Sequence, residues 1–232
     1  MDIILIPGLW LDGSSWHKVV PFLERAGHRV VALTPPGHDG QEPSTVTYGD
    51  LVGAVVTEID QSAGHVMLVG HSAACAAAWA AADRRPDKVA CVVLVGGFPI
   101  PTGSPILDGF EPVDGLVHFP GWAAFDGPDS ADLDDASKAE LESHMTPAPG
   151  QYAVGIQELD DDRRYGLPVV NVCTEYSADE LHGWVDQGFP PVSELRKLRH
   201  AGYVDLESGH WPQISRPEDL AEVILRAATV VQ

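Results

Sequence analysis

Six short apolar runs recur along this chain and constrain its fold more than any other feature. They are rich in β-branched residues, do not alternate with polar residues, and mostly end in turn or polar residues. Strands buried on both faces have this composition, and such strands are typical of a parallel sheet. The runs are Ile3–Ile6, Arg29–Leu33, Val66–Val69, Val89–Val95, Val169–Cys173 and Tyr203–Leu206.

Segments with helical periodicity lie between these runs. Ser15–Ala26, Tyr48–Gln61 and the alanine-rich Ser72–Asp83 are predicted helices. A last helix is predicted to begin at Ser215, whose hydroxyl would form a capping box with Glu218. Because strands and helices alternate, we expect an α/β domain with a mostly parallel, doubly wound sheet of about six strands. A chain of 232 residues is long enough to bury the core of one such domain.

Residues 99–165 interrupt the alternation. This segment is rich in Pro, Gly and Asp and holds fourteen acidic residues against Lys138, Arg163 and Arg164, a formal charge of −11 out of the chain's −20. Structureless connections longer than about 15 residues are uncommon inside a compact domain. We therefore predict that 99–165 is an inserted acidic cap or lid with helices, and that residues 1–98 and 166–232 form the core.

The net charge excludes some classes of partner. The chain has 34 acidic and 14 basic residues, and its field repels phosphate backbones and anionic lipid headgroups. We expect neither nucleic acid nor a membrane surface as a partner.

The cysteines and the N-terminal residues indicate the compartment. Cys75, Cys91 and Cys173 lie in separate apolar stretches without close pairing, which predicts buried thiols rather than disulfides or a zinc site. The first residues carry no basic leader, and no apolar run is long enough to span a bilayer. A soluble cytoplasmic protein is the expectation.

A serine stands where the third apolar run meets a helix. Residues 66–74, VMLVGHSAA, form a strand that runs directly into a helix. A nucleophilic serine at such a corner has a strained backbone, so the residues two before and two after it must be small; here they are Gly70 and Ala74. The spacing predicts Ser72 as a nucleophile rather than an ordinary helix cap, and it directs the amide of Ala73 toward a developing oxyanion.

The exit of the first strand carries a second motif. Residues 3–16, IILIPGLWLDGSSW, contain Pro-Gly and then a small residue and Trp that open a helix. Here the chain resembles the α/β-hydrolase family, in particular its plant methylesterase and hydroxynitrile-lyase branch of serine esterase type. The resemblance implies a minimal form of that fold, with the backbone amide of Leu9 as second oxyanion donor. Pro7 replaces the histidine usual in the family, and the alternative is a simple glycine turn.

His210 is the candidate base. It follows a short strand and a turn and precedes the final helix, where the family's catalytic histidine stands, and the order serine, acid, histidine is respected. The resemblance implies that its imidazole accepts the Ser72 proton and returns it to the leaving group. The alternative is a surface histidine.

Several carboxylates remain open as the third member of the triad. In the similar branch an aspartate follows the strand that ends at residue 173, but this loop is shorter and Tyr176 holds that place. Glu175 is preferred because its side chain is one methylene longer than that of aspartate and could span the extra distance to the histidine that the shorter loop leaves. Asp179 is the second candidate, although the dipole of the following helix also explains it. Asp108 or Glu111, after the fourth strand, are further candidates.

Trp10, His71 and Trp211 flank these motifs and are predicted to line the substrate pocket. His71 is expected to pack there rather than to transfer protons. Tryptophans fit an aromatic pocket wall and a hydrophobic core equally well. The other tryptophans to which both interpretations apply are Trp16, Trp122 and Trp184.

The motifs together predict a serine hydrolase without cofactor or metal. Neither GxGxxG nor GxxxxGK[ST] occurs, and the histidines show no metal-ligand spacing. The resemblance implies hydrolysis of a small carboxylic ester, thioester or lactone through an acyl-enzyme by a monomer or homodimer. The alternatives are a non-hydrolytic ligand receptor, or a lyase, acyltransferase or cofactor-free oxygenase. The lyases carry lysine after the catalytic histidine, where this chain has Trp211.

Overall fold

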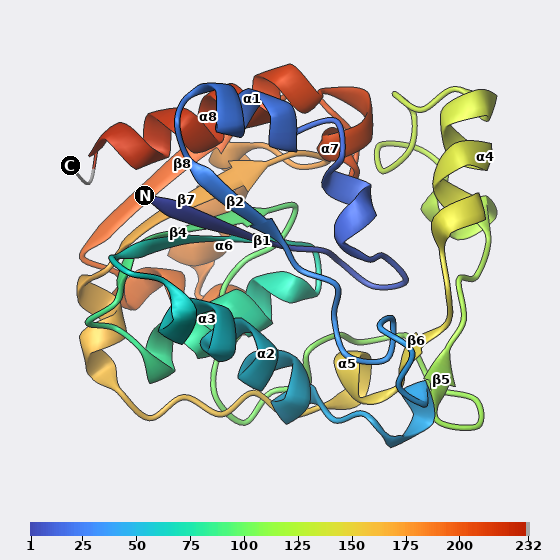
Figure 1. Ribbon diagram of the computed structural model, residues 1–232, viewed down its shortest axis with the longest axis horizontal. Helices are drawn as coiled ribbons and strands as arrows, with labels where there is room; N and C mark the ends of the chain where they lie inside the picture. The colour runs from blue at the N-terminus through green and yellow to red at the C-terminus, as the bar shows by residue number, and fades with distance from the viewer. Residues whose placement is uncertain (231–232) are drawn as a thin grey trace.

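A single six-stranded sheet lies at the centre of the computed structural model, which describes residues 1–230 (Figure 1). Its strands are β1 (Asp2–Ile6), β2 (Arg29–Ala32), β3 (Val66–His71), β4 (Val89–Val95), β7 (Pro168–Cys173) and β8 (His200–Asp205). Their order across the sheet is β2-β1-β3-β4-β7-β8, and every neighbouring pair is parallel. The chain thus winds first toward β2 and then back through β3 to β8, which is a doubly wound arrangement.

All six predicted strands are present, and the predicted α/β sheet is confirmed. The last strand begins at His200 rather than Tyr203, because β8 pairs with β7 from Pro168 onward. β3 is buried along its whole length, whereas β8 lies at the edge of the sheet and is more exposed. An edge strand has fewer buried side chains, and its apolar pattern is correspondingly weaker.

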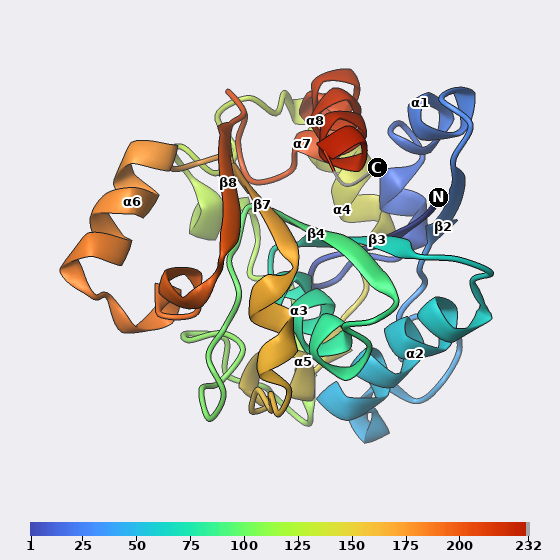
Figure 2. The ribbon, with the colours of Figure 1, turned by 90° about the vertical axis from the view of Figure 1, so that its left-hand side faces the viewer.

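Helices cover both faces of the sheet (Figures 1 and 2). The flanking helices are α1 (Val20–Arg25), α2 (Tyr48–Gln61), α3 (Ala74–Arg84) and α8 (Pro217–Val230). In β1, Ile4 and Ile6 belong to the cluster formed with α2 and α3, and Ile3 and Leu5 to the cluster formed with α1 and α8. Alternate residues of a strand face opposite sides, so one short strand supplies both cores.

Two helix predictions are wrong in detail. Ser15–Ala26 is a 3₁₀ helix, η1 (Gly13–Trp16), followed by the shorter α1, which has Pro21 in its first turn, where no amide donor is needed. The capping box of Ser215 with Glu218 is absent: Ser215 ends a short helix, α7 (Pro212–Ser215), and its hydroxyl donates to the carbonyl of Trp211 at 3.4 Å. The final helix begins only at Pro217, because proline favours the first turn.

The acidic segment 99–165 contains short helices and a two-stranded antiparallel pair. Its elements are β5 (Leu116–Val117), α4 (Asp135–His144), β6 (Ala148–Pro149) and α5 (Gln151–Val154). In Figure 1 α4, β5 and β6 lie beyond the carboxyl ends of the strands. The division into core and cap stays a prediction, but the position of this segment places it over the edge where the candidate site residues gather.

Further short elements complete the fold. Helix α6 (Ala178–Gln187) follows β7 and lies beside β8 (Figure 2). The remaining 3₁₀ helices are η2 (Pro43–Thr45), η3 (Trp122–Phe125), η4 (Asp162–Gly166), η5 (Pro190–Val192) and η6 (Leu195–Lys197). The three cysteines are free and buried, as predicted. Within residues 1–230, no helix combines the length and apolar character needed to cross a membrane.

Candidate active site

Ser72 occupies the sharp turn between β3 and α3. Its φ is 55°, in the left-handed region that few residues other than glycine adopt, and its amide donates to the carbonyl of Val95 at 2.9 Å. A Cβ on Gly70 would lie 2.7 Å from the carbonyl oxygen of Ala74. The turn therefore needs glycine at position 70, as the sequence motif predicts, and it presents the Ser72 hydroxyl at the carboxyl edge of the sheet.

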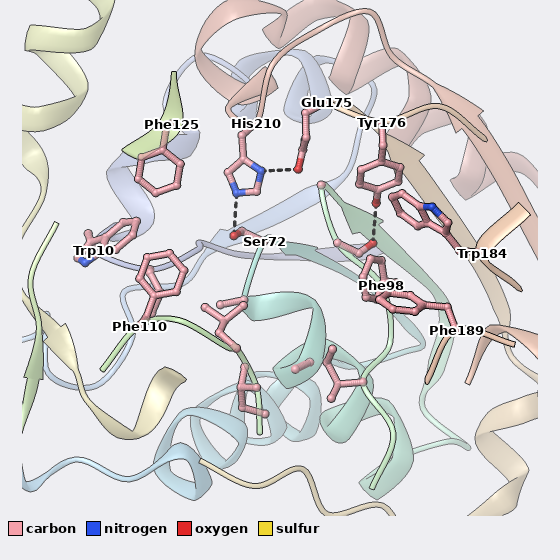
Figure 3. A pocket seen from close by; sticks show the side chains of 18 residues that line it. Trp10, Ser72, Phe98, Phe110, Phe125, Glu175, Tyr176, Trp184, Phe189 and His210 are labelled. Carbon is pink, nitrogen blue, oxygen red and sulfur yellow. Dashed lines mark hydrogen bonds and ion pairs between the residues drawn. The ribbon is translucent and has the colours of Figure 1, made fainter. Parts of the chain in front are cut away.

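Three side chains that are distant in sequence form one chain of hydrogen bonds at this edge (Figure 3). Nε2 of His210 lies 2.8 Å from Oγ of Ser72. Nδ1 of the same ring lies 2.8 Å from Oε1 of Glu175. Ser72 follows β3, Glu175 follows β7, and His210 stands in the loop after β8, so parallel strands bring all three to the same end of the sheet.

The hydrogen bonds determine where the protons lie. An ionised carboxylate can only accept, so Nδ1 of His210 carries a proton and donates it to Glu175. In the neutral imidazole Nε2 is then the acceptor, and it faces the Ser72 hydroxyl. The arrangement can remove a proton from Ser72 and hold the resulting imidazolium beside a negative charge.

Glu175 is held in its ionised form. Burial raises its pKa, but the hydrogen bond and charge of His210, together with the hydrogen bond from Thr174, outweigh this and lower the pKa to about 2. Thr174 donates its hydroxyl to the second carboxylate oxygen. Both oxygens of Glu175 thus have partners, and the carboxylate is negatively charged at neutral pH.

The other carboxylates considered for this position lie elsewhere. Asp179 is exposed in the first turn of α6, and Asp108 and Glu111 are exposed in the acidic segment. None of the three is hydrogen-bonded to His210, whereas Glu175 is. Glu175 stands two residues after the end of β7, and from there its carboxylate reaches the imidazole.

The amides of Leu9 and Ala73 lie on the two backbone segments that meet at Ser72. Within residues 1–230, neither amide donates a hydrogen bond to another protein group. A Cβ on Gly8 would lie 2.8 Å from Nδ1 of His71 and 3.1 Å from Cβ of Ser72, so the loop after β1 packs directly on the Ser72 turn. Two free backbone donors beside a serine hydroxyl can bind the oxygen of a polarised carbonyl.

A cavity of about 390 Å³ opens above Ser72. In Figure 3 one group of aromatic side chains lies on the Trp10 side of Ser72 and another on the Tyr176 side. Among residues 1–230, no lysine or arginine lines the cavity, and Glu175 is the one carboxylate that does. The aromatic lining residues are Trp10, Phe98, Phe110, Phe125, Tyr176, Trp184 and Phe189.

Two residues predicted to line the pocket do not. Trp10 lines it, but His71 is 1% exposed and lies behind the Ser72 turn, where it contacts the backbone of His210. Trp211 is 2% exposed and packs against Trp122 and Phe125. His71 directly precedes Ser72 and Trp211 directly follows His210, yet both side chains pack into the interior and not into the cavity.

Most of the aromatic lining is not predicted from the sequence. Phe98 follows the end of β4 and Tyr176 follows Glu175, so their positions after buried strands were a usable signal. Phe110 and Phe125 come from the acidic segment and Phe189 from the loop after α6, where no periodic pattern marks a residue as inward-facing. Trp184, left open between wall and core, lines the cavity.

The described residues offer no grouped set of three metal ligands. Over residues 1–230, no three histidine, cysteine, aspartate or glutamate side chains come together in a way that could hold a metal ion.

The chain is similar in sequence to known hydrolases. A family model described as the alpha/beta hydrolase family matches residues 3–223. Methylesterase 9 of Arabidopsis thaliana is 26% identical over 257 residues, covering 97% of this chain and 97% of that protein. A pyrethroid hydrolase of Sphingobium wenxiniae is 37% identical over 246 residues, covering 96% of this chain and 86% of that protein.

Solved structures share the fold. The crystal structure of a methylesterase from Arabidopsis superposes with a TM-score of 0.78 at 16% identity and covers 99% of both chains. At this identity the likeness is one of fold. This likeness of fold is consistent with the six-stranded sheet and the helical layers on its two faces.

Proposed function

Since this chain belongs to the alpha/beta hydrolase family, we propose that it is a serine esterase that cleaves a small, uncharged carboxylic ester through an acyl-enzyme. A thioester or lactone would react in the same way. The single observation that carries the proposal is the Ser72–His210–Glu175 chain of hydrogen bonds at the floor of an apolar cavity. The relatives named as a methylesterase and a pyrethroid hydrolase support it.

The proposed reaction begins with attack by Oγ of Ser72 on the ester carbonyl carbon. Nε2 of His210 takes the hydroxyl proton as the bond forms, and the Glu175 carboxylate stabilises the imidazolium. The carbonyl oxygen becomes an oxyanion that accepts hydrogen bonds from the amides of Leu9 and Ala73. His210 then protonates the departing alkoxide, which leaves Ser72 acylated.

Water completes the cycle. It enters the position of the departed alcohol and gives a proton to His210 as its oxygen attacks the acyl carbon. The second tetrahedral species collapses as the bond between its carbon and Oγ of Ser72 breaks, His210 returns the proton to Oγ, and the acid is released. Ester and water are the two reactants, and His210 transfers the protons in every step.

The lining of the cavity favours neutral substrates. A charged carboxylate or phosphate would enter a volume lined mainly by aromatic and aliphatic side chains, with no lysine or arginine among the described lining residues, and would lose much of its hydration without compensation. A volume of about 390 Å³ accommodates a compact organic ester. We propose an ester whose groups on both sides of the carbonyl are apolar.

The test compares four variants on a short-chain aryl ester. Ser72→Ala and His210→Ala should lower kcat by about 10³- to 10⁶-fold, and Glu175→Gln by about 10³- to 10⁴-fold. Asp179→Asn is the matched control for the acid, because Asp179 lies four residues after Glu175 but is exposed in the first turn of α6, and it should retain the wild-type rate. A larger loss for Asp179→Asn than for Glu175→Gln would reassign the acid.

A fluorophosphonate probe tests the nucleophile separately. Mass spectrometry should locate the adduct on Ser72 in the wild type and find no adduct in Ser72→Ala. A wild-type protein that binds an ester in the cavity but neither hydrolyses it nor reacts with the probe would contradict the proposal and favour a ligand receptor.

A further inference from the structure

His71 makes a buried hydrogen bond that the proposed reaction does not use. Its Nε2 lies 2.7 Å from the backbone carbonyl oxygen of His210, and its side chain is almost completely buried. A carbonyl oxygen can only accept, so Nε2 of His71 carries the proton and Nδ1 does not. The residue next to the proposed nucleophile thus donates to the backbone of the proposed base.

Gln213 completes this network from the other side of the ring. Its side-chain amide nitrogen lies 3.4 Å from Nδ1 of His71, and the residue is fully buried in α7. The amide oxygen of Gln213 has no hydrogen-bond partner within the described part of the chain. Burying such an oxygen costs free energy, and a leucine of similar size would avoid the cost. The position therefore retains a donor for His71 at the expense of stability.

His71 is a neutral donor. Burial, and then the charge of His210, lower its pKa to about 3, although its hydrogen bond to the His210 carbonyl and the charge of Glu175 act in the opposite direction. The two imidazole rings are 5.1 Å apart between centroids. A lysine or arginine donor at this position would repel the imidazolium that His210 forms during the reaction, whereas a neutral imidazole does not.

The peptide of His210 is held from two directions. Its amide donates to the carbonyl of Asp129, in the acidic segment, at 2.7 Å, while its carbonyl accepts from His71 in the core. A Cβ on the preceding Gly209 would lie 2.4 Å from the same Asp129 oxygen, so the loop fits closely against that segment. With both backbone groups fixed, small displacements of the ring relative to Ser72 and Glu175 are restricted.

We propose that His71 and Gln213 are positioning residues for His210: the neutral N–H of His71, oriented by Gln213, holds the backbone of His210 so that its ring meets both Ser72 and Glu175. This inference rests on the proposed function, because it assigns His71 and Gln213 no contact with substrate. They act through the base.

Steady-state kinetics test the proposal with variants that distinguish the hydrogen-bond donor of His71 from the volume of its side chain. His71→Phe keeps a ring but removes the donor, and should lower kcat about 10- to 100-fold with little change in KM, because misplacement of a catalytic group acts on the chemical step. His71→Gln keeps a neutral N–H donor and should recover much of this loss. His65→Gln, at an exposed histidine, is the matched control and should be unchanged.

Gln213→Leu gives the second variant. It removes the donor to Nδ1 of His71 and keeps a side chain of similar size. We expect it to lower kcat by a smaller factor than His71→Phe does. If His71→Phe does not fold, Gln213→Leu alone tests whether the network positions His210. Variants that lower only the melting temperature, with kcat within twofold of the wild type, would show a purely structural role and overturn the proposal.

A spectroscopic measurement separates this inference from the proposed function. The proton between Nδ1 of His210 and Glu175 should give a low-field proton NMR resonance in the wild type, which shifts or broadens in His71→Phe and Gln213→Leu but not in His65→Gln. If the wild type hydrolyses no ester and Ser72 is not labelled, the proposed function fails, and this resonance alone decides the positioning role. An unchanged resonance in both variants would contradict it.

Discussion

At the scale of single residues, burial determines which groups of the site carry charge. Glu175 is ionised because His210 and Thr174 supply donors that outweigh the effect of burial on its pKa. For His71 the effect of burial dominates, and its pKa falls to about 3 although it donates to the backbone carbonyl of His210. Glu175 is therefore an anion and His71 a neutral donor, and both are hydrogen-bonded to His210.

His71 should make stability depend on pH. Its pKa is about 3 in the folded protein against 6.5 ordinarily, so between these values the unfolded chain binds more protons than the folded chain. The stabilisation is present above pH 6.5 and is lost as the pH falls toward about 3. In this window, unfolding of the wild type should take up about one more proton than unfolding of His71→Gln.

Thermal unfolding at several pH values measures this difference. The melting temperature of the wild type should fall more steeply on acidification from pH 6.5 than that of His71→Gln, and His65→Gln should follow the wild type. Parallel curves for the wild type and His71→Gln would show that His71 is not buried in its neutral form.

At the scale of elements, the site depends on how closely α3 and the loop after β1 approach the end of β3. Gly70 lets the backbone of α3 pass within contact of the strand, and Gly8 does the same for the loop that carries the Leu9 amide. Ser72 takes a positive φ because α3 and the loop after β1 both pack closely against this turn and hold it in place. The strain at one residue is balanced by the packing of two whole elements.

Gly70→Ala should test this close approach. The added methyl group would lie 2.7 Å from a backbone oxygen of Ala74 and 3.0 Å from Cβ of Ala78, so α3 must shift. We expect a loss of about 1–3 kcal/mol in the free energy of unfolding, measured in urea, together with a lower kcat.

Gly64→Ala is the control for Gly70→Ala. A Cβ at Gly64 would meet no heavy atom within 4 Å, and this variant should keep the wild-type stability and rate. Equal destabilisation by the two substitutions would contradict close packing at the Ser72 turn as the cause, because the effect of alanine on the unfolded chain is stabilising.

At the scale of the whole molecule, a buried ion network ties together three parts of the chain. Arg164, in η4, lies 3.0 Å from Asp83 of α3 and 3.3 Å from Glu194, before η6, and all three side chains are at most 4% exposed. Asp83 also accepts hydrogen bonds from the amides of Asp160 and Asp161. The network connects the end of the acidic segment and the loop after α6 to α3, the helix that follows Ser72.

Arg164→Met should destabilise the protein strongly. It leaves Asp83 buried without its charge partner and removes one of two cations from Glu194, which keeps Lys197 at 2.8 Å, and breaking a buried pair in this way costs about 3–5 kcal/mol. Denaturant unfolding measures the effect. The adjacent Arg163→Met removes only exposed ion pairs with Asp87 and Asp161, and its stability should stay close to that of the wild type. Equal losses for the two variants would contradict the role of burial.

Local patterns were sufficient to predict the sheet. Each buried strand is marked by its own run of β-branched residues, and the small residues around Ser72 are required by backbone contacts within the same few residues, so both can be read without knowledge of distant segments. The position of His210 between a strand and the last helix is likewise a local feature. Errors occurred where proline decided helix boundaries, at Pro21 and Pro217.

The sequence by itself determined the α/β architecture and the strand ends at which chemistry could occur, because periodicity and turn sterics act over short range. Only the tertiary structure decided that Glu175, rather than Asp179, meets His210, and that His71 faces the His210 backbone instead of the cavity. It also gathered Phe110, Phe125 and Phe189 into one lining. These outcomes depend on contacts between residues far apart in the chain, and such contacts are set by how loops pack on the finished sheet.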